Sequence, residues 1–186
     1  MGVYPRLETE RLVLRALTLA DAPDVQRLAG DRAVYNTTLH IPHPYEDGAA
    51  EKWIGTHQGA FDEGKGVVFG IVRRADDSLV GSISLSIDQS HARAELGYWI
   101  GKPHWNQGYC TEAAQAVLDY GFNVLGLNKI FAHHFEGNPA SGAVMRKLGM
   151  AYEGCLRQHV KKDERFVDLE QYSILKHEYE AAEKTT

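Results

Sequence analysis

The chain has 186 residues, of which 44% are hydrophobic and 24% are charged, and these proportions predict one globular domain over residues 1–186. Twenty basic residues against 25 acidic ones give a formal net charge of −5, which argues against nucleic acid as a binding partner. No apolar run approaches the roughly 18 residues of a membrane span, and the first residues lack the apolar segment of a secretory signal. We therefore expect a cytoplasmic protein with no membrane partner.

The first elements of the chain are predicted to be a strand and two helices. Residues 11–17 have the alternation and composition of a strand. They lead into a short helix over residues 18–30, which opens with the spacing of a capping box. Two prolines make residues 36–45 irregular, and a second helix is expected over residues 47–63.

The middle of the chain is predicted to form a hairpin, a further strand and the longest helix. Residues 67–74 and 79–87 form the hairpin, and isoleucine and leucine alternate with serine in its second strand. One face of that strand therefore contacts water or polar groups. Residues 93–100 form the fourth predicted strand, and the helix after it carries apolar residues at helical spacing as far as Leu125.

The last part of the chain is predicted to complete the sheet. Residues 128–135 form a strand, residues 139–149 a short helix, and residues 152–160 and 166–175 a charged hairpin. The adjacent histidines at 133 and 134 would point to opposite faces of their strand, so they would not form a metal site. The fold class is therefore α+β, with a mixed and mainly antiparallel sheet flanked by helices.

The segment HWNQGYCTEAA, residues 104–114, joins the fourth predicted strand to the longest helix. The free N–H groups and the dipole at a helix N-terminus bind phosphate oxygens, and Gly108 would let an anion approach that backbone closely. A glycine between a strand and a helix is also common in ordinary turns. The spacing by itself leaves both interpretations open.

This segment resembles the pyrophosphate-binding motif of the GCN5-related N-acetyltransferases (GNAT), Arg/Gln-x-x-Gly-x-Gly/Ala. The stretches TERLVLR, PHPY, AELGYWIG and NPASGAVMRKLGM appear in the order typical of the family, and are most similar to its ribosomal-protein N-terminal acetyltransferases. The resemblance covers Leu7 to Tyr179 and implies a single acetyltransferase domain, with a sheet splayed between its fourth and fifth strands. In two departures from the motif, Trp105 takes the place of Arg/Gln and Cys110 that of Gly/Ala.

The resemblance implies an acetyl-CoA-dependent N-acetyltransferase that uses no metal. Backbone amides near Gly108 would bind the pyrophosphate, a strand N–H near Ile100 would polarise the acetyl carbonyl, and Asn138 would bind the pantetheine arm. Asn138 is equally suited to opening a turn. The residues expected to bind the cosubstrate are Trp99, Ile100, Gln107, Gly108, Tyr109, Cys110, Thr111, Asn138 and Lys147.

Acetyl transfer to an amine requires a base for the amine and a proton donor for the departing thiolate. Glu95 and Glu153 both match base positions of the family, and each could instead be a surface glutamate. Ser141 matches the proton donor, with a helix cap as its alternative. Cys110 is not expected to act as a nucleophile, because no histidine lies at the spacing of an activating partner. The charges of residues 161–165 are interpreted as a solvated turn.

The acceptor is expected to bind between residues 35–45 and the charged hairpin, which flank the substrate in relatives. We favour the α-amino group of a peptide or protein, such as a ribosomal protein. The alternatives are a small-amine acetyltransferase, acting on a polyamine, an amino acid or an antibiotic, and a non-catalytic acyl-CoA-binding module. The resemblance also admits a homodimer.

Overall fold

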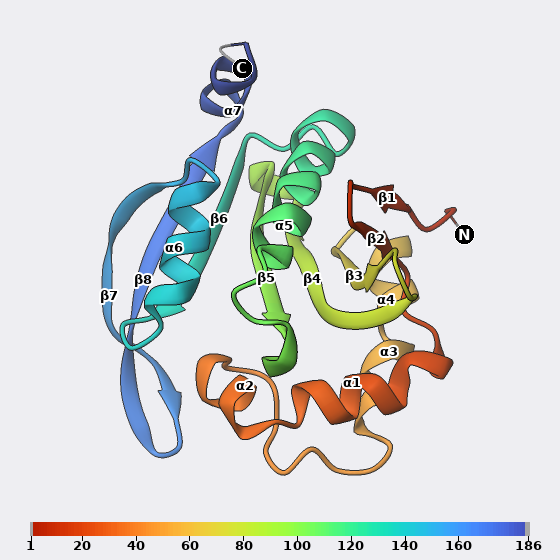
Figure 1. The fold of residues 1–186 in the computed structure, drawn as a ribbon. Helices are drawn as coiled ribbons and strands as arrows, with labels where there is room; N and C mark the ends of the chain where they lie inside the picture. Colours follow the sequence, from red (N-terminus) through yellow and green to blue (C-terminus); the bar gives the residue numbers. More distant parts are fainter. Residues whose placement is uncertain (1, 185–186) are drawn as a thin grey trace.

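The computed structural model describes residues 2–184 of the chain. Within that range, the centre of the molecule is an eight-stranded sheet with the order β1-β2-β3-β4-β5-β6-β8-β7 (Figure 1). Strands β5 and β6 are parallel, and every other neighbouring pair is antiparallel. This arrangement confirms the predicted fold class. The strands are β1 (Leu7–Glu8), β2 (Leu12–Arg15), β3 (Gly66–Arg73), β4 (Ser78–Asp88), β5 (Arg93–Ile100), β6 (Lys129–Phe135), β7 (Ala151–Lys162) and β8 (Arg165–Leu175).

The helices agree with the sequence in most places, but one predicted helix is divided and two observed helices are not predicted. The predicted helix over residues 47–63 is divided at Thr56, whose hydroxyl donates to the carbonyl of Trp53 at 2.7 Å and so competes with helical hydrogen bonding. The sequence does not predict α2, α7 or β1, because such short or polar segments show no clear periodicity. The helices are α1 (Ala22–Ala29), α2 (Arg32–Thr37), α3 (Ala49–Gly55), α4 (His57–Asp62), α5 (Tyr109–Asp119), α6 (Pro139–Lys147) and α7 (Lys176–Glu183).

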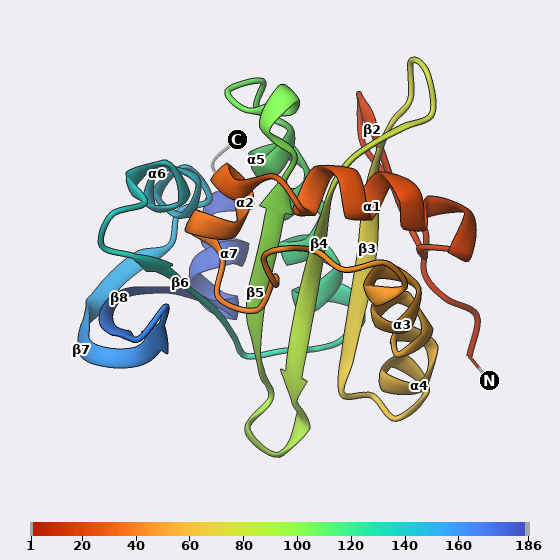
Figure 2. The ribbon, with the colours of Figure 1, turned by 90° about the horizontal axis from the view of Figure 1, so that it is seen from below.

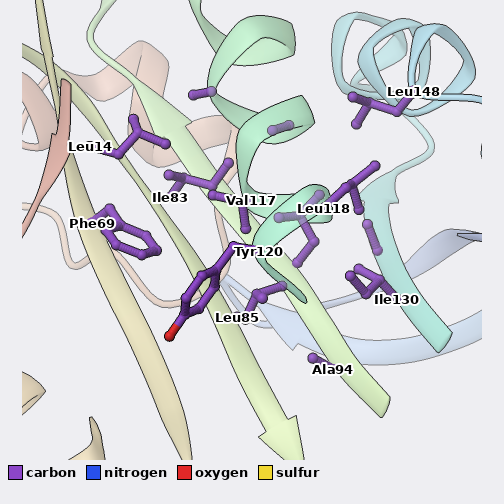
Figure 3. Packing of buried hydrophobic residues seen from close by; sticks show 14 of the residues in the cluster. Leu14, Phe69, Ile83, Leu85, Ala94, Val117, Leu118, Tyr120, Ile130 and Leu148 are labelled. Atoms are coloured by element: carbon purple, nitrogen blue, oxygen red, sulfur yellow. The ribbon is translucent and has the colours of Figure 1, made fainter. Parts of the chain in front are cut away.

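Helices cover both faces of the sheet. Val117 of α5 packs on one face in a cluster with Leu14, Phe69 and Ile83 (Figure 3). Helices α1 and α2 cross the opposite face (Figure 2), where the next residue of β2, Val13, is buried with the side chains of α1 and α3. Burial of each large apolar side chain contributes about 1.5–3 kcal/mol, so the central strands are held from both sides.

Strands β5 and β6 are paired over only part of their length. Residues 93–95 of β5 pair with residues 129–131 of β6, whereas β6 pairs with β8 along all of its residues. From Leu96 to Ile100, the strand partner of β5 is β4 alone. This divergence confirms the splay expected between the fourth and fifth strands of the sequence prediction, and it leaves one edge of β5 available to a ligand (Figure 1).

Candidate active site

A cleft of about 830 Å³ opens where β5 and β6 diverge. This volume lies in the upper part of the roughly 300–1,000 Å³ range of small-molecule sites, so the cleft has room for two reactants. Among the residues predicted for the site, Gln107 and Glu153 do not line the cleft. Those that do are Glu95, Trp99, Ile100, Gly108, Tyr109, Cys110, Thr111, Asn138, Ser141 and Lys147.

One end of the cleft is formed by the N-terminus of α5. Gly108 precedes the helix with a φ of +80°, a conformation that glycine adopts without the steric cost borne by other residues. Within the described chain, no side chain caps this end of the helix. The N–H groups of Tyr109, Cys110 and Thr111 at the first helical positions are therefore suited to binding an anion, as the motif predicts.

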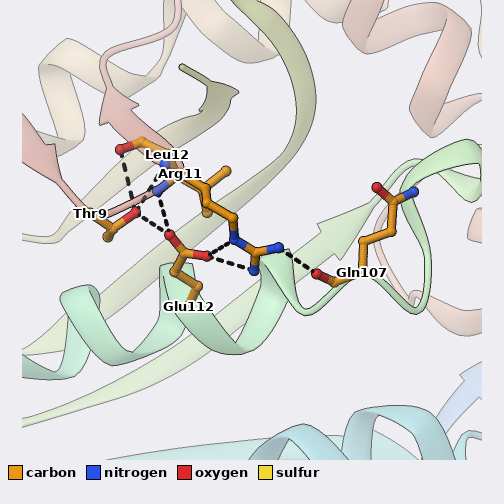
Figure 4. A network of polar contacts seen from close by, with 5 residues as sticks. All are labelled: Thr9, Arg11, Leu12, Gln107 and Glu112. Carbon is orange, nitrogen blue, oxygen red and sulfur yellow. Dashed lines mark hydrogen bonds and ion pairs between the residues drawn. The ribbon is translucent and has the colours of Figure 1, made fainter. Parts of the chain in front are cut away.

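Arg11 fixes this loop to the start of β2 (Figure 4). Its guanidinium donates to the carbonyl of Gln107 at 2.9 Å and to the carboxylate of Glu112 on α5 at 2.7 Å. A Cβ on Gly108 would lie 3.2 Å from the same guanidinium, so a cation borders the proposed anion site. Trp105, at the motif position of Arg/Gln, donates its ring N–H to the carbonyl of Ile100 at 2.6 Å instead. Arg11 lies within the TERLVLR stretch, but sequence reasoning gave it no role.

Glu95 enters the cleft from the face of the sheet that α1 and α2 cover. The register pairs it with Ser86 and places Ser82 and Ser84 of β4 in the cleft, so the predicted polar face of that strand is part of the cleft wall. An oxygen of Glu95 lies 3.1 Å from Nδ1 of His133 on β6. This hydrogen bond lowers the pKa of Glu95, although burial acts in the opposite direction.

Ser141 faces the cleft from the other face of the sheet, on α6. Its Oγ lies 2.7 Å from the hydroxyl of Tyr98, which points to the opposite side of β5 from Glu95 because strand side chains alternate. Burial raises the pKa of Tyr98, so its hydroxyl stays protonated. That hydroxyl also lies 3.3 Å from the backbone carbonyl of Ser141, and either hydroxyl can be the donor in the bond between them. When Tyr98 donates to Oγ, Ser141 keeps its own proton for another acceptor. Sequence reasoning missed Tyr98, although alternation along AELGYWIG could have indicated its face.

The helix cap at this position is Asn138 and not Ser141. The side-chain oxygen of Asn138 accepts from the backbone N–H of Ser141 at 3.3 Å, which makes Asn138 the N-cap of α6. The hydroxyl of Ser141, the alternative cap, is directed to Tyr98 instead. Ser141 is therefore available for chemistry, and Asn138 has a structural role in addition to lining the cleft.

Cys110 lines the cleft but is not an activated nucleophile. Burial raises the pKa of its thiol to about 12, so the thiol is protonated at neutral pH. This favours direct transfer over an acyl-enzyme. No group of three or more histidine, cysteine, aspartate or glutamate side chains in residues 2–184 is arranged to hold a metal ion.

Glu153, the second candidate base, lies outside the cleft at the exposed surface of β7. Its carboxylate accepts from Lys129 at 2.6 Å, from Gln171 at 2.5 Å and from Ser173 at 2.8 Å. These contacts, that of Lys129 above all, lower the pKa of Glu153 to about 2. Such a carboxylate is a weak base, and of the two candidates the structure brings only Glu95 into the cleft.

Away from the N-terminus of α5, the wall of the cleft is largely apolar and includes Val34, Leu39, Ile41, Tyr45 and Trp53. Of the described residues that line the cleft, Glu95 is the only carboxylate.

Lys162 at the tip of the β7–β8 hairpin donates to the carbonyls of Tyr35 and Thr38 at 2.9 and 2.6 Å, and Asp163 accepts from the Tyr35 hydroxyl. Residues 161–165 form the expected turn, in which every residue but Lys162 is exposed, and Lys162 and Asp163 also fasten the hairpin to α2.

Similarity to known proteins covers most of the chain. Residues 11–151 match the family described as "Acetyltransferase (GNAT) domain". The "Uncharacterized N-acetyltransferase YoaA" of Bacillus subtilis is 36% identical over 176 residues, which cover 94% of this chain and 98% of that protein. The "Putative ribosomal N-acetyltransferase YdaF" of the same species is 39% identical over 106 residues, 56% of this chain and 58% of that protein.

Two further similarities bear on the acceptor and on the fold. A "Spermidine N(1)-acetyltransferase" of Vibrio cholerae is 27% identical over 170 residues, 91% of this chain and 95% of that protein. The crystal structure of a "Probable acetyltransferase" superposes with a TM-score of 0.83 at 30% identity, over 93% of this chain and 98% of that one. Along the described chain, no helix has the length and apolar character needed to span a membrane.

Proposed function

Because the chain belongs to the GNAT family of acetyltransferases, we propose that its acceptor is the α-amino group of a peptide or protein, such as a ribosomal protein. Membership makes the protein an acetyl-CoA-dependent N-acetyltransferase and confirms the resemblance to the family. A putative ribosomal N-acetyltransferase is among its relatives and supports the proposed acceptor. One observation carries the proposal for the acceptor: Glu95 is the only carboxylate among the described residues of the cleft. An α-amino group brings one positive charge, which one carboxylate can match.

A small amine is the second candidate, supported by the similarity to a spermidine acetyltransferase. A polyamine carries several ammonium groups, and each one buried without a partner costs free energy. Glu51 acts on Tyr45 electrostatically but does not line the cleft, so the described residues of the cleft wall supply no second carboxylate. The cleft therefore suits a peptide N-terminus, or another amine on a neutral body, better than a polycation.

The proposed roles follow from the two faces of β5. The N–H groups that follow Gly108 hold the pyrophosphate of acetyl-CoA, and Asn138 and Lys147 contact its pantetheine arm. The free edge of β5 near Ile100 polarises the acetyl carbonyl. Glu95 takes a proton from the amine on one face of the sheet, and Ser141, oriented by Tyr98, donates one to the thiolate on the other. The whole chain acts as one acetyltransferase domain.

An acceptor panel tests this proposal. Release of the CoA thiol is measured with peptides of increasing length that begin with Ser or Ala, with spermidine and with free amino acids. We expect kcat/KM to rise over the first few residues of the peptide, because binding of the remote residues positions the amine. Turnover of spermidine with inert peptides would refute the proposal. Binding of acetyl-CoA with no turnover of any amine would identify a non-catalytic module.

The variant Ser141→Ala is expected to lower kcat by about 10-fold or more, since loss of a general acid removes stabilisation that develops as the sulfur gains charge. Acetyl-CoA affinity and Tm should change little, because the side chain of Asn138 supplies the cap. Steady-state kinetics, calorimetry and thermal melting make the comparison. Asn138→Ala is the matched control and should cost about 1 kcal/mol of stability. Normal kcat with a lowered Tm in Ser141→Ala would assign that residue a structural role only.

A further inference from the structure

The imidazole of His133 on β6 is held between two acceptor groups, one inside the cleft and one outside it. Its Nδ1 lies 3.1 Å from the carboxylate of Glu95 on β5, and its Nε2 lies 2.8 Å from the amide oxygen of Gln171 on β8. Gln171 in turn donates its amide N–H to Glu153 on β7 at 2.5 Å. A continuous line of polar side chains therefore joins Glu95 in the cleft to Glu153 outside it.

The direction of these hydrogen bonds fixes the protons of His133. The Glu153 carboxylate only accepts hydrogen bonds, and Lys129, 2.6 Å away, keeps it ionised. The amide nitrogen of Gln171 must therefore face Glu153, which turns the amide oxygen toward His133. Nε2 must then carry a proton in both charge states of the ring. Nδ1, which faces Glu95, is the nitrogen that gains or loses a proton.

We propose that His133 receives the proton lost by the acceptor amine, with Glu95 as the carboxylate that contacts the amine. This inference rests on the proposed function. The step balances without a further reactant: an N–H bond of the ammonium group breaks, the proton passes through an oxygen of Glu95, and an N–H bond forms at Nδ1 of His133. The amine is left neutral with a free lone pair, and its charge moves to an imidazolium paired with Glu95.

The pKa of an imidazole lies closer to that of the amine than the pKa of an isolated carboxylate does. The ordinary pKa of an α-amino group is about 8, against about 6.5 for histidine and about 4 for glutamate. Glu95 and His133 act on each other, and each is also affected by one further charged or titratable group. For Glu95 this group is His40, from the segment after α2, and for His133 it is Glu153. The contact between the pair raises the pKa of His133 and lowers that of Glu95, and Gln171 and Glu153 further raise the former. The surroundings therefore move the protonation site from the carboxylate to the ring.

In this scheme, Glu153 and Gln171 are positioning residues. They do not line the cleft. Glu153 acts on the ring through its hydrogen bond with the amide of Gln171 and through its charge, which raises the pKa of His133. Their effect is to hold the proton on Nε2, so that the lone pair of Nδ1 in the neutral ring faces Glu95. The two glutamates that the sequence offers as alternative bases thus occupy the two ends of one hydrogen-bonded line.

The positions of the protons can be measured without any acceptor. Protein labelled with ¹⁵N at histidine is titrated by long-range ¹H–¹⁵N NMR, and the variant His133→Gln assigns the signal of His133. We expect Nε2 to stay protonated at every pH and Nδ1 to titrate with a midpoint above 6.5. A neutral ring protonated at Nδ1, or a midpoint below 6.5, would overturn the inference. This result does not depend on the identity of the acceptor.

The kinetic test uses the pH profile of kcat at saturating peptide, which reports groups in the enzyme–substrate complex. The base must be unprotonated, so kcat should rise with pH through the midpoint of His133 and then level off. We call this rise of kcat with pH the acid limb of the profile. His133→Gln, which can still hydrogen-bond to Glu95, should lose the acid limb, and its kcat at pH 8 should be lower by about 10-fold or more. An unchanged limb and unchanged kcat in that variant would overturn the inference.

Two further variants separate positioning from general disturbance of the sheet. In Glu153→Gln, the amide of Gln171 is free to turn, so the acid limb should move to lower pH. Ser173→Ala removes another partner of Glu153 while leaving Gln171 in place, and should leave the limb unmoved. Equal shifts in both variants would contradict the role given to Glu153. If no peptide is acetylated, the proposed function fails, while the NMR titration still tests the hydrogen-bonded line.

Discussion

Replacing Glu95 with glutamine is expected to lower kcat by about 100-fold or more while leaving the affinity for acetyl-CoA unchanged. Loss of a general base costs about 10² to 10⁴ in rate, and glutamine keeps the size of the side chain without its basicity. The pyrophosphate loop at Gly108 is formed by other elements, so binding of the cosubstrate should not change. Stopped-flow or steady-state turnover at saturating peptide, with calorimetry for acetyl-CoA, measures both quantities.

Glu153→Gln is the matched control for this variant. It carries the same chemical change on the neighbouring sheet surface, but Glu153 does not line the cleft. Near pH 8, above the expected limb of His133, it should lose far less of its kcat than Glu95→Gln does, because Glu95 and His133 both stay in place. Comparable losses in both variants would contradict the assignment of Glu95 as the group that contacts the amine. Full activity of Glu95→Gln would exclude any role for that carboxylate in deprotonation.

Local periodicity predicts much of this fold because it reports which side chains each element buries. The alternation of isoleucine and leucine with serine in residues 79–87 correctly indicates a strand with one polar face, and that face lines the cleft at Ser82 and Ser84. The apolar spacing of α5 likewise identifies the helix that covers the sheet, with Val117 and Leu118 fully buried. Such patterns require no knowledge of which strands are neighbours.

The interactions that complete the site depend on strand register and are not visible in the sequence. His133 meets Glu95 because β6 runs parallel beside β5, and it meets Gln171 because the two residues are register partners in β6 and β8. The contact of Lys162 with Tyr35 joins residues that are 127 positions apart. Motif reasoning finds residues that act through their own backbone or position, such as Gly108, but misses those that act through a distant partner.

The variant Gly108→Glu is expected to weaken acetyl-CoA binding by about 100-fold or more, for three separable reasons. A residue other than glycine pays roughly 1–2 kcal/mol to adopt the positive φ of this position. The added Cβ would lie 3.2 Å from the guanidinium of Arg11 and so press on the contacts that fix the loop. The new carboxylate would repel the pyrophosphate, an effect that salt should reduce.

Two matched variants assign the loss measured in Gly108→Glu to its causes. Gly108→Ala introduces the strain and the Cβ contact without the charge, so its affinity should fall by a smaller factor that salt does not change. Gly126→Ala introduces similar strain at φ +67°, in a position where a Cβ meets no atom within 4 Å and outside the cleft, so it should lower Tm without weakening acetyl-CoA binding. Calorimetry at two salt concentrations and thermal melting separate these effects. If Gly108→Glu binds acetyl-CoA as tightly as the wild type, the pyrophosphate does not bind at the N-terminus of α5.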